Sequence, residues 1–306
     1  MTWGVLLMAY GTASGPKDVL RYYTHIRHGR PPTEAQVQDL IARYEAIGGL
    51  SPLALITQRQ ACGLQAALDQ RCGPNAYRVF LGLKHASPFI HEGVQAMAAD
   101  GIERAVGLVL APHFSSMSVG KYLQEAKTTI DQLDRPMTWR GIRSWAAEPG
   151  LIELLRRRIE QARESFSKAE QENLPIIFSA HNLPQRILQD GDPYPDELRT
   201  TGDLVATSLG TDHYTFSWQS AGRTSEPWMR PDILEKLQQM RQDGVTQAII
   251  CPCGFVSDHL EILYDLDIQA QDHAHQLGMH VERTTSLNDD RDFIQVLAQI
   301  VEDTAR

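Results

Sequence analysis

The chain has 306 residues, of which 42% are hydrophobic and 22% charged, and its mean hydropathy is -0.31. These values are typical of a soluble globular protein and exclude a disordered or membrane-spanning chain. The net charge of -9 argues against a nucleic-acid-binding protein, because neutralising phosphates needs a surplus of Lys and Arg. The opening MTWGVLLMAYG lacks the basic region of a signal peptide. We therefore expect a cytoplasmic protein without a transmembrane segment.

Short apolar runs alternate with longer amphipathic stretches along the chain, a pattern that indicates βα units around parallel sheets. The apolar periodicity predicts helices over 149–167 and 231–243, where apolar positions recur at steps of three and four residues. The predicted strands, in chain order, are 3–9, 77–83, 105–111, 137–141, 175–180, 214–218, 247–252 and 279–284. The fold class is therefore α/β.

The two halves of the chain resemble each other. VLLMAYGT is similar to IIFSAHNLP, and VGLVLAPHFSS is similar to AIICPCGFVSD. Tyr10 then matches His181 at an offset of 171 residues, whereas Pro112 matches Pro252 at an offset of 140. The offsets differ by 31 residues, so the first half carries an extra segment after its first strand.

This extra segment falls within residues 18–53 and is called the arm below. A duplicated α/β chain predicts two similar domains, 1–145 with the arm and 146–306, that face a cleft. Ligands bind at the carboxyl ends of parallel strands. Tyr10 and His181 both follow such a strand, so we expect them to face each other across the cleft.

His181 stands at the end of an apolar strand, and Asn-Leu-Pro after it turns the chain. A histidine at this place can bind a metal ion or take a proton near neutral pH. A half-buried histidine with a purely structural hydrogen bond is the alternative. His85 and His113 also follow predicted strands, and each is either a ligand or a residue that shapes the strand end.

Three carboxylates follow the strand at 247–252. Asp258, Glu261 and Asp265 are spaced three and four residues apart, which predicts one acidic ridge on a helix that begins near Ser257. Such a ridge suits a cation like Fe²⁺. The spacing of Asp258 and Glu261 also fits a helix-capping arrangement, and the sequence leaves both interpretations open.

The arm combines Arg residues with aromatic ones. Arg side chains bind carboxylates bidentately and tyrosine rings pack on a flat π-system, which suits a planar anionic aromatic ligand. A solvated helix face explains the arginines equally well, but Gly48, Gly49 and Pro52 favour a loop. The residues concerned are Arg27, Arg30, Arg43, Tyr22, Tyr23 and Tyr44.

The spacing of the four cysteines fits no zinc or redox motif, so we interpret them as free thiols of a reducing compartment. An iron–sulfur cluster would need all four to converge from distant segments. These cysteines are Cys62, Cys72, Cys251 and Cys253.

Eight segments resemble the ferrochelatase family, in the family's order and along nearly the whole chain. They are MAYGT (8–12), YYTHIRHGR (22–30), RYEAIGGLSPL (43–53), GLKHASP (82–88), APHFSSMSVGKY (111–122), SAHNLP (179–184), SWQSAGRTSEPW (217–228) and GFVSDHLEILYDLD (254–267). The chain is most similar to the short bacterial type that acts on coproporphyrin III.

The resemblance implies a chelatase-like fold, with two similar domains that each hold a four-stranded parallel sheet flanked by helices, and a porphyrin cleft between them. It implies that His181 and Glu261 form the catalytic metal site on one side of the porphyrin and that Tyr10 coordinates iron from the other. It also implies porphyrin and propionate contacts from Arg27, Arg43, Tyr44, Ser51 and Tyr122.

Two positions depart from the family pattern. Gln269 stands where many relatives carry a glutamate, which weakens any further metal relay along the helix, and His28 stands where some have a second arginine. The Cys-rich tail of cluster-bearing relatives is also missing, so we expect no iron–sulfur cluster and no cofactor beyond the substrate Fe²⁺.

The expected reaction is insertion of Fe²⁺ into coproporphyrin III. The alternatives are protoporphyrin IX as the substrate, a cobalt or nickel chelatase of corrinoid synthesis, and a non-catalytic tetrapyrrole- or haem-binding protein of the same fold. The expected partners are the porphyrin and ferrous iron, with an iron donor or other haem-pathway enzymes as further candidates. We expect a monomer.

Overall fold

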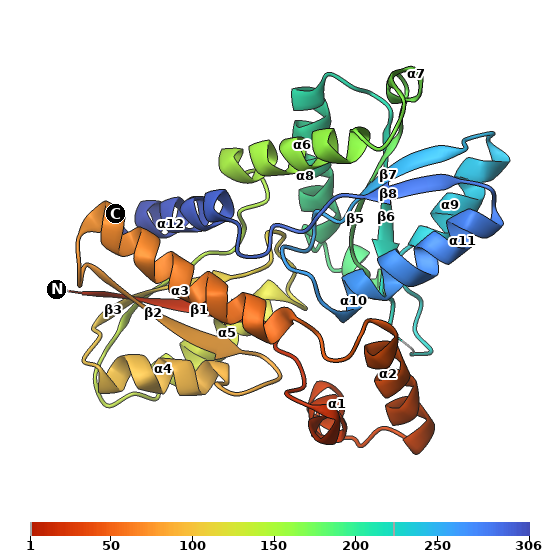
Figure 1. Cartoon of the computed structure of the whole chain (residues 1–306). Helices are drawn as coiled ribbons and strands as arrows, with labels where there is room; N and C mark the ends of the chain where they lie inside the picture. Colours follow the sequence, from red (N-terminus) through yellow and green to blue (C-terminus); the bar gives the residue numbers. More distant parts are fainter. Residues whose placement is uncertain (1, 223) are drawn as a thin grey trace. The chain divides into compact units, whose positions relative to one another are not determined.

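A computed structural model describes residues 2–222 and 224–306, so that Met1 and Arg223 of the SWQSAGRTSEPW motif lie outside the described residues. The chain forms two compact units (Figure 1). Unit 1 comprises Met1–Trp145, Ser257–His259 and Asn288–Arg306, and unit 2 comprises Ala146–Val256 and Leu260–Leu287. No helix of the described residues is both long and apolar enough to span a bilayer.

Each unit contains a four-stranded parallel sheet. In unit 1 the order is β2-β1-β3-β4, with β1 Trp3–Ala9, β2 Tyr77–Leu83, β3 Arg104–Val109 and β4 Thr138–Gly141. In unit 2 it is β6-β5-β7-β8, with β5 Ile176–His181, β6 Tyr214–Gln219, β7 Gln247–Cys251 and β8 His280–Arg283. The two orders are the same once the strands are numbered within each unit. The predicted strands and the predicted duplication are thereby confirmed.

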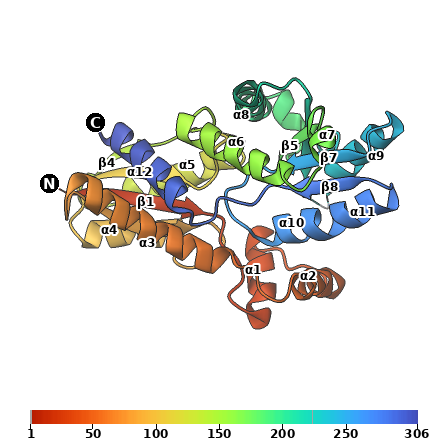
Figure 2. The same cartoon turned by 45° about the horizontal axis from the view of Figure 1, so that its top comes forward.

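The sheet of unit 1 is covered on both faces by helices. Leu6 and Met8 of β1 pack with α4 (Ile90–Ala99) and α5 (Val119–Ile130). The opposite face carries α3 (Leu53–Cys72) and α12 (Arg291–Ala305), which pack against each other (Figure 2). Because both faces are buried, β1 reads as a continuous apolar run, and Val5, Leu6, Leu7 and Met8 have no exposed surface.

The sheet of unit 2 is enclosed in the same way. On one face α6 (Pro149–Arg163) packs with α8 (Tyr194–Leu209). On the other, α9 (Ile233–Gln242) and α11 (Gln271–Gln276) pack together, and Ile177 and Ile250 of the sheet share a core with Leu237. Helices α6 and α9 confirm those predicted at 149–167 and 231–243. The shorter elements are η1 (Pro16–Asp18), α7 (Lys168–Gln171), η2 (Gln185–Leu188), α10 (Leu260–Leu263) and the π-helix η3 (Asp265–Ala270).

The last helix belongs to unit 1, although the predicted domain boundaries place residues 288–306 in the second domain. Phe293, Leu297 and Val301 of α12 are fully buried, and α12 lies against α3. An ion pair between Arg71 and Glu302 joins the same two helices. The first segment of unit 1 ends at Trp145 and unit 2 begins at Ala146, where the sequence analysis placed the domain boundary. Helix α12 belongs to unit 1 because it packs against residues far from it in the chain.

The arm is helical, which makes the loop interpretation of its tyrosines wrong. It forms α1 (Val19–Ile26) and α2 (Glu34–Ala46), which contact each other beyond the carboxyl end of the strands (Figure 1). Tyr22 lies on α1 and Tyr44 on α2, and both side chains are buried. Helix α2 begins with a capping box in which the Thr33 and Gln36 side chains bond each other's backbone amides. The glycines and prolines lie at the ends of the helices.

Candidate active site

His181 is the last residue of β5, at the carboxyl end of the sheet of unit 2. The backbone on both sides of it is fixed by side chains. The Tyr194 hydroxyl donates to the His181 carbonyl at 2.9 Å. Asn182, which is 1% exposed, donates through Nδ2 to the Met229 carbonyl and accepts from the Met229 amide, both at 3.0 Å. The strand therefore ends at a rigid point from which the imidazole projects.

The imidazole of His181 contacts the carboxylate of Glu261. Nδ1 lies 2.9 Å from Oε2, and the two side chains are 37% and 34% exposed. Burial lowers the pKa of His181, but the charge of Glu261, the hydrogen bond to it and the charge of Asp265 together raise this pKa above the ordinary value of 6.5. The structure thus brings together the two residues predicted to form the metal site of unit 2.

Glu261 lies on α10, and Gln219 at the end of β6 fixes its backbone. The Gln219 amide nitrogen donates to the Glu261 carbonyl at 3.1 Å, while its oxygen accepts from Ser179 Oγ at 2.9 Å. The next residue, Ser220, donates to Asp265 Oδ2 at 2.5 Å. The sequence prediction missed Gln219 and Ser220, although both lie in the quoted SWQSAGRTSEPW motif.

The predicted acidic ridge is wrong for Asp258. Helix α10 begins only at Leu260, and Asp258 is counted with unit 1, where its carboxylate accepts from Asn288 Nδ2 at 2.8 Å. Asp265 begins a π-helix, Asp265–Ala270. The regular α-helix that would align the three carboxylates in one ridge is therefore not formed. Asp265 and Glu261 remain in unit 2, and both act on the pKa of His181.

Tyr10 follows β1 in unit 1, as His181 ends β5 in unit 2. Its side chain is 43% exposed, and its ring centroid lies 4.5 Å from that of His85. The His85 amide donates to the Tyr10 carbonyl at 2.9 Å, which fixes the two strand ends to each other. Tyr10 and His181 have equivalent positions in the two units because the chain is duplicated. That they face each other across a cleft stays a prediction.

The other predicted porphyrin contacts also lie in unit 1. Arg27 follows α1 as its C-cap and donates through Nε to the Arg30 carbonyl at 3.2 Å, whereas Arg43 on α2 pairs with Asp39 at 3.1 Å. The Tyr44 hydroxyl lies 3.3 Å from Thr12 Oγ1, next to the end of β1.

Ser51 and Tyr122 are both buried. Ser51 Oγ accepts from the Leu53 amide at 3.3 Å at the start of α3. Tyr122 lies on α5, with the Lys84 ammonium 5.7 Å from its ring centroid. Their roles toward a porphyrin stay predictions.

Within the described residues, no three His, Cys, Asp or Glu side chains are grouped closely enough to hold a metal ion together. Cys62 and Cys72 are exposed, and Cys251 and Cys253 are buried. Burial raises the pKa of the Cys251 thiol to about 12 and that of Cys253 well above its usual range. The absence of an iron–sulfur cluster stays a prediction.

Solved structures of chelatases share this fold over the whole chain. They include the sirohydrochlorin chelatase SirB from Bacillus subtilis subspecies spizizenii in complex with cobalt, at a TM-score of 0.62 and 8% identity, covering 100% of this chain and 96% of that one. CbiX, described as the terminal enzyme of sirohaem biosynthesis in denitrifying bacteria, matches with a TM-score of 0.55 and 12% identity over 98% of both chains. The predicted chelatase-like fold is confirmed.

The family comparison is more specific. The ferrochelatase family matches residues 2–305, and the chain belongs to this family. It is 43% identical to the coproporphyrin III ferrochelatase of Geobacillus thermodenitrificans, over 98% of this chain and 95% of that one. It is 45% identical to that of Anoxybacillus flavithermus, over 97% and 95%, and 42% identical to that of Listeria innocua, over 98% and 97%.

Proposed function

We propose that this protein inserts Fe²⁺ into coproporphyrin III to form coproheme, as a metal-inserting lyase of haem biosynthesis. The observation that carries the proposal is the His181–Glu261 pair at the carboxyl end of β5. It stands in a chain 42–45% identical, over nearly its whole length, to proteins named coproporphyrin III ferrochelatase.

The contact with Glu261 assigns a role to each nitrogen of His181. A carboxylate only accepts, so Nδ1 carries the proton of the neutral ring and donates it to Oε2, which leaves the lone pair on Nε2. Nε2 is then the atom that ligates the ferrous ion or accepts a pyrrole proton. A carboxylate behind a histidine also makes the imidazole a better base and fixes its orientation.

The reaction requires a base and no redox chemistry. Two N–H protons leave the porphyrin as Fe²⁺ binds its four nitrogens, and the iron keeps its charge. The imidazole accepts one proton at a time at Nε2 and passes it to solvent, and Glu261 stabilises the imidazolium formed in between. The raised pKa of His181 is consistent with this role.

Unit 1 supplies the porphyrin contacts in this proposal. Arg27 and Arg43 recognise propionate carboxylates, for which a guanidinium fork is well matched. Tyr44, Ser51 and Tyr122 contact the macrocycle or its propionates, and Tyr10 coordinates iron axially. The cytoplasmic location, the monomeric state and an iron donor stay predictions from the sequence.

The test is an anaerobic assay of the purified protein with Fe²⁺ and coproporphyrin III, followed by the loss of free-porphyrin fluorescence. Parallel reactions contain protoporphyrin IX, or Co²⁺ or Ni²⁺ in place of Fe²⁺. We expect coproheme to form far above the uncatalysed rate and kcat/KM to be highest for Fe²⁺ with coproporphyrin III. No metalloporphyrin above the uncatalysed rate would refute the enzymatic function, and a preference for protoporphyrin IX would refute the substrate.

A further inference from the structure

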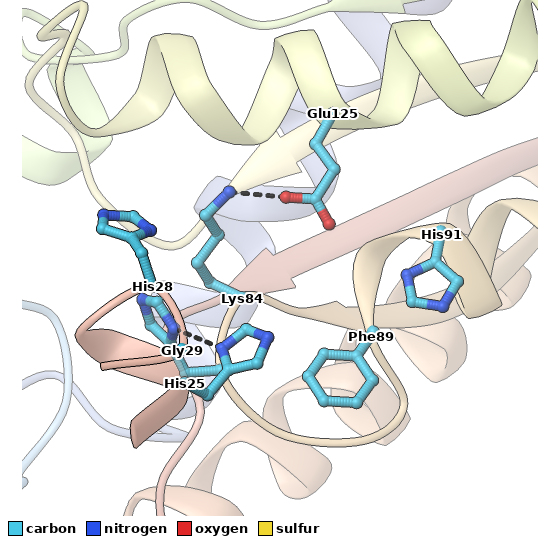
Figure 3. Close-up of a pocket in the computed structure, with 8 residues that line it drawn as sticks. His25, His28, Gly29, Lys84, Phe89, His91 and Glu125 are labelled. Atoms are coloured by element: carbon cyan, nitrogen blue, oxygen red, sulfur yellow. Dashed lines mark hydrogen bonds and ion pairs between the residues drawn. The ribbon is translucent and has the colours of Figure 1, made fainter. Parts of the chain in front are cut away.

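Partly buried ion pairs occur in both units, and they differ in geometry. In unit 1 Lys84 pairs with Glu125 on the wall of a cavity of about 490 Å³, where a dashed line joins the two side chains (Figure 3). An ammonium acts as a point charge. In unit 2 the Arg283 guanidinium binds both oxygens of Asp267, through Nε at 2.5 Å and through Nη2 at 2.8 Å. The pair in unit 2 therefore fixes the orientation of its carboxylate as well as its distance.

The Arg283 side chain is itself held firmly. It is 14% exposed, and the Asp267 side chain is 34% exposed. Arg283 is the last residue of β8, so its side chain starts from a fixed strand end. Its third nitrogen, Nη1, donates to the Thr284 carbonyl at 3.0 Å. The guanidinium is thus a rigid support for the carboxylate that it binds.

Asp267 belongs to the π-helix η3, which directly follows the helix α10 that carries Glu261. Backbone hydrogen bonds join the two helices. The Tyr264 amide donates to the Leu260 carbonyl at 2.8 Å, and the Tyr264 carbonyl accepts from the Gln269 amide at 2.9 Å. The second bond spans five residues and closes the wide turn of the π-helix. A displacement of the π-helix is therefore transmitted to the turn that carries Glu261.

Side chains hold the π-helix from both sides of the sheet of unit 2, in which β6 and β8 are the outer strands. Asp265 accepts from Ser220, which follows β6, at 2.5 Å. Asp267 is bound by Arg283 at the end of β8. His181 ends β5, which pairs with β6. Arg283 thus supplies the contact on the β8 side.

From this geometry we propose that Arg283 is a positioning residue for iron insertion. Its fork fixes the π-helix through Asp267 and thereby holds the Glu261 carboxylate against His181. The inference rests on the proposed function. Arg283 itself neither transfers a proton nor binds the metal, because a guanidinium stays protonated and has no acceptor. π-helices are rare and are frequent at functional sites, which agrees with a support for this one.

The variant Arg283→Lys tests the fork. Lysine keeps the charge beside Asp267 but cannot reproduce the two parallel bonds of the guanidinium. We expect kcat for coproheme formation to fall about tenfold, as for other residues that support a ligating histidine, and KM for coproporphyrin III to stay unchanged. The matched control is Arg186→Lys, at a more exposed Arg–Glu pair of the same unit, and it should keep the wild-type kcat.

A second measurement separates positioning from a loss of stability. The Arg283→Lys substitution is repeated in the Glu261→Gln variant, where the carboxylate that it should position is absent. We expect kcat to fall less than about twofold in this background, because residues that act through one another are not additive. The same tenfold factor in both backgrounds would overturn the proposal, and so would a wild-type kcat in folded Arg283→Lys.

Hydrogen exchange of the substrate-free protein, followed by mass spectrometry, tests the contact without the reaction. The π-helix amides should exchange at least about tenfold faster in Arg283→Lys than in wild type, and those of α6 should not change. Unchanged exchange in the π-helix would overturn the proposal. If the wild type forms no coproheme, the proposed function fails, whereas the exchange still decides whether Arg283 holds the π-helix.

The variant Asp267→Asn removes the same fork from its other side. It should give the same changes in kcat and in exchange as Arg283→Lys, and it decides the question if Arg283→Lys does not fold, which circular dichroism checks. Wild-type kcat and exchange in folded Asp267→Asn would equally contradict the role of the pair.

Discussion

His181 and Glu261 are 80 positions apart in the chain, yet their side chains meet with Nδ1 2.9 Å from Oε2. The contact depends on three supports in unit 2. The end of β5 holds His181, α10 carries Glu261, and Gln219 at the end of β6 bonds the backbone beneath Glu261. Each support can be removed separately, and the consequences differ.

Replacing Glu261 by Gln should shift the pH profile of iron insertion. The carboxylate raises the pKa of His181 above 6.5, and the base must be neutral, so the wild-type rate should fall as the pH drops through a value above 6.5. Without the charge the imidazolium is less stable, and the acidic limb should move to lower pH. We also expect a rate about 10- to 100-fold lower, as for other partners of ligating histidines.

The control for this experiment is Glu282→Gln, which removes a second His–Glu pair of the same unit, since Glu282 Oε1 lies 3.2 Å from His280 Nε2. It should leave the profile of kcat against pH unchanged. An acidic limb at the same pH in Glu261→Gln and wild type would contradict the assigned interaction.

Replacing Gln219 by Ala should destabilise the protein and slow it. The side chain is 1% exposed, and its loss leaves the buried Ser179 hydroxyl and the Glu261 carbonyl without this partner. We expect a loss of about 2–3 kcal/mol in the free energy of unfolding, measured by urea denaturation. Gln238→Ala, at an exposed position on α9, is the control. A change below about 0.5 kcal/mol in Gln219→Ala would show that the bonds do not support Glu261.

Replacing Arg43 by Ala should act on substrate binding. If this guanidinium binds a propionate, its loss removes a charge-assisted hydrogen bond of about 1.5–3 kcal/mol, which corresponds to at least a tenfold rise in KM for coproporphyrin III. The value of kcat should change little. Arg21→Ala, at an exposed arginine of the same arm that has no predicted role in binding, is the control. An unchanged KM in Arg43→Ala would remove Arg43 from the porphyrin site.

His113 should make the stability of the fold depend on pH. The residue is 2% exposed, and burial lowers its pKa from 6.5 to about 3. As the pH falls below 6.5 the unfolded chain binds a proton here that the folded chain does not bind until about pH 3. The fold should therefore lose about 1.4 kcal/mol per pH unit in this interval and keep its full stability above pH 6.5.

The measurement is the free energy of unfolding at pH 7, 6 and 5 for wild type and His113→Asn. The variant should show a shallower slope, whatever its absolute stability, and His213→Gln, at an exposed position, should keep the wild-type slope. Equal slopes for wild type and His113→Asn would contradict the lowered pKa.

The sheets were predictable because a parallel strand buried on both faces is a continuous apolar run, and β1 and β2 have the predicted bounds. The duplication was visible for the same reason, since the strand ends Tyr10 and His181 stand in similar sequences. The start of α2 also has a signal in the sequence, because Thr33 and Gln36 have the spacing of a capping box, but the tyrosines and glycines nearby favoured a loop.

Other features have no local signal. The place of α12 beside α3 depends on which apolar faces meet, and an amphipathic helix does not specify its partner. The spacing of Asp258, Glu261 and Asp265 predicts a regular α-helix, but the structure has a π-helix at Asp265–Ala270. Gln219 bonds Ser179 and Glu261, which are far from it in the chain, so only the folded sheet shows its role.

The most direct test of the account is the rate of coproheme formation by His181→Ala, with Fe²⁺ and coproporphyrin III under anaerobic conditions. We expect kcat to fall at least 100-fold, the scale of a positioned general base, while coproporphyrin binding measured by fluorescence quenching stays close to wild type. His213→Ala, at an exposed histidine of the same unit, should be fully active. A folded His181→Ala variant with wild-type kcat would contradict the central claim that His181 performs metal insertion.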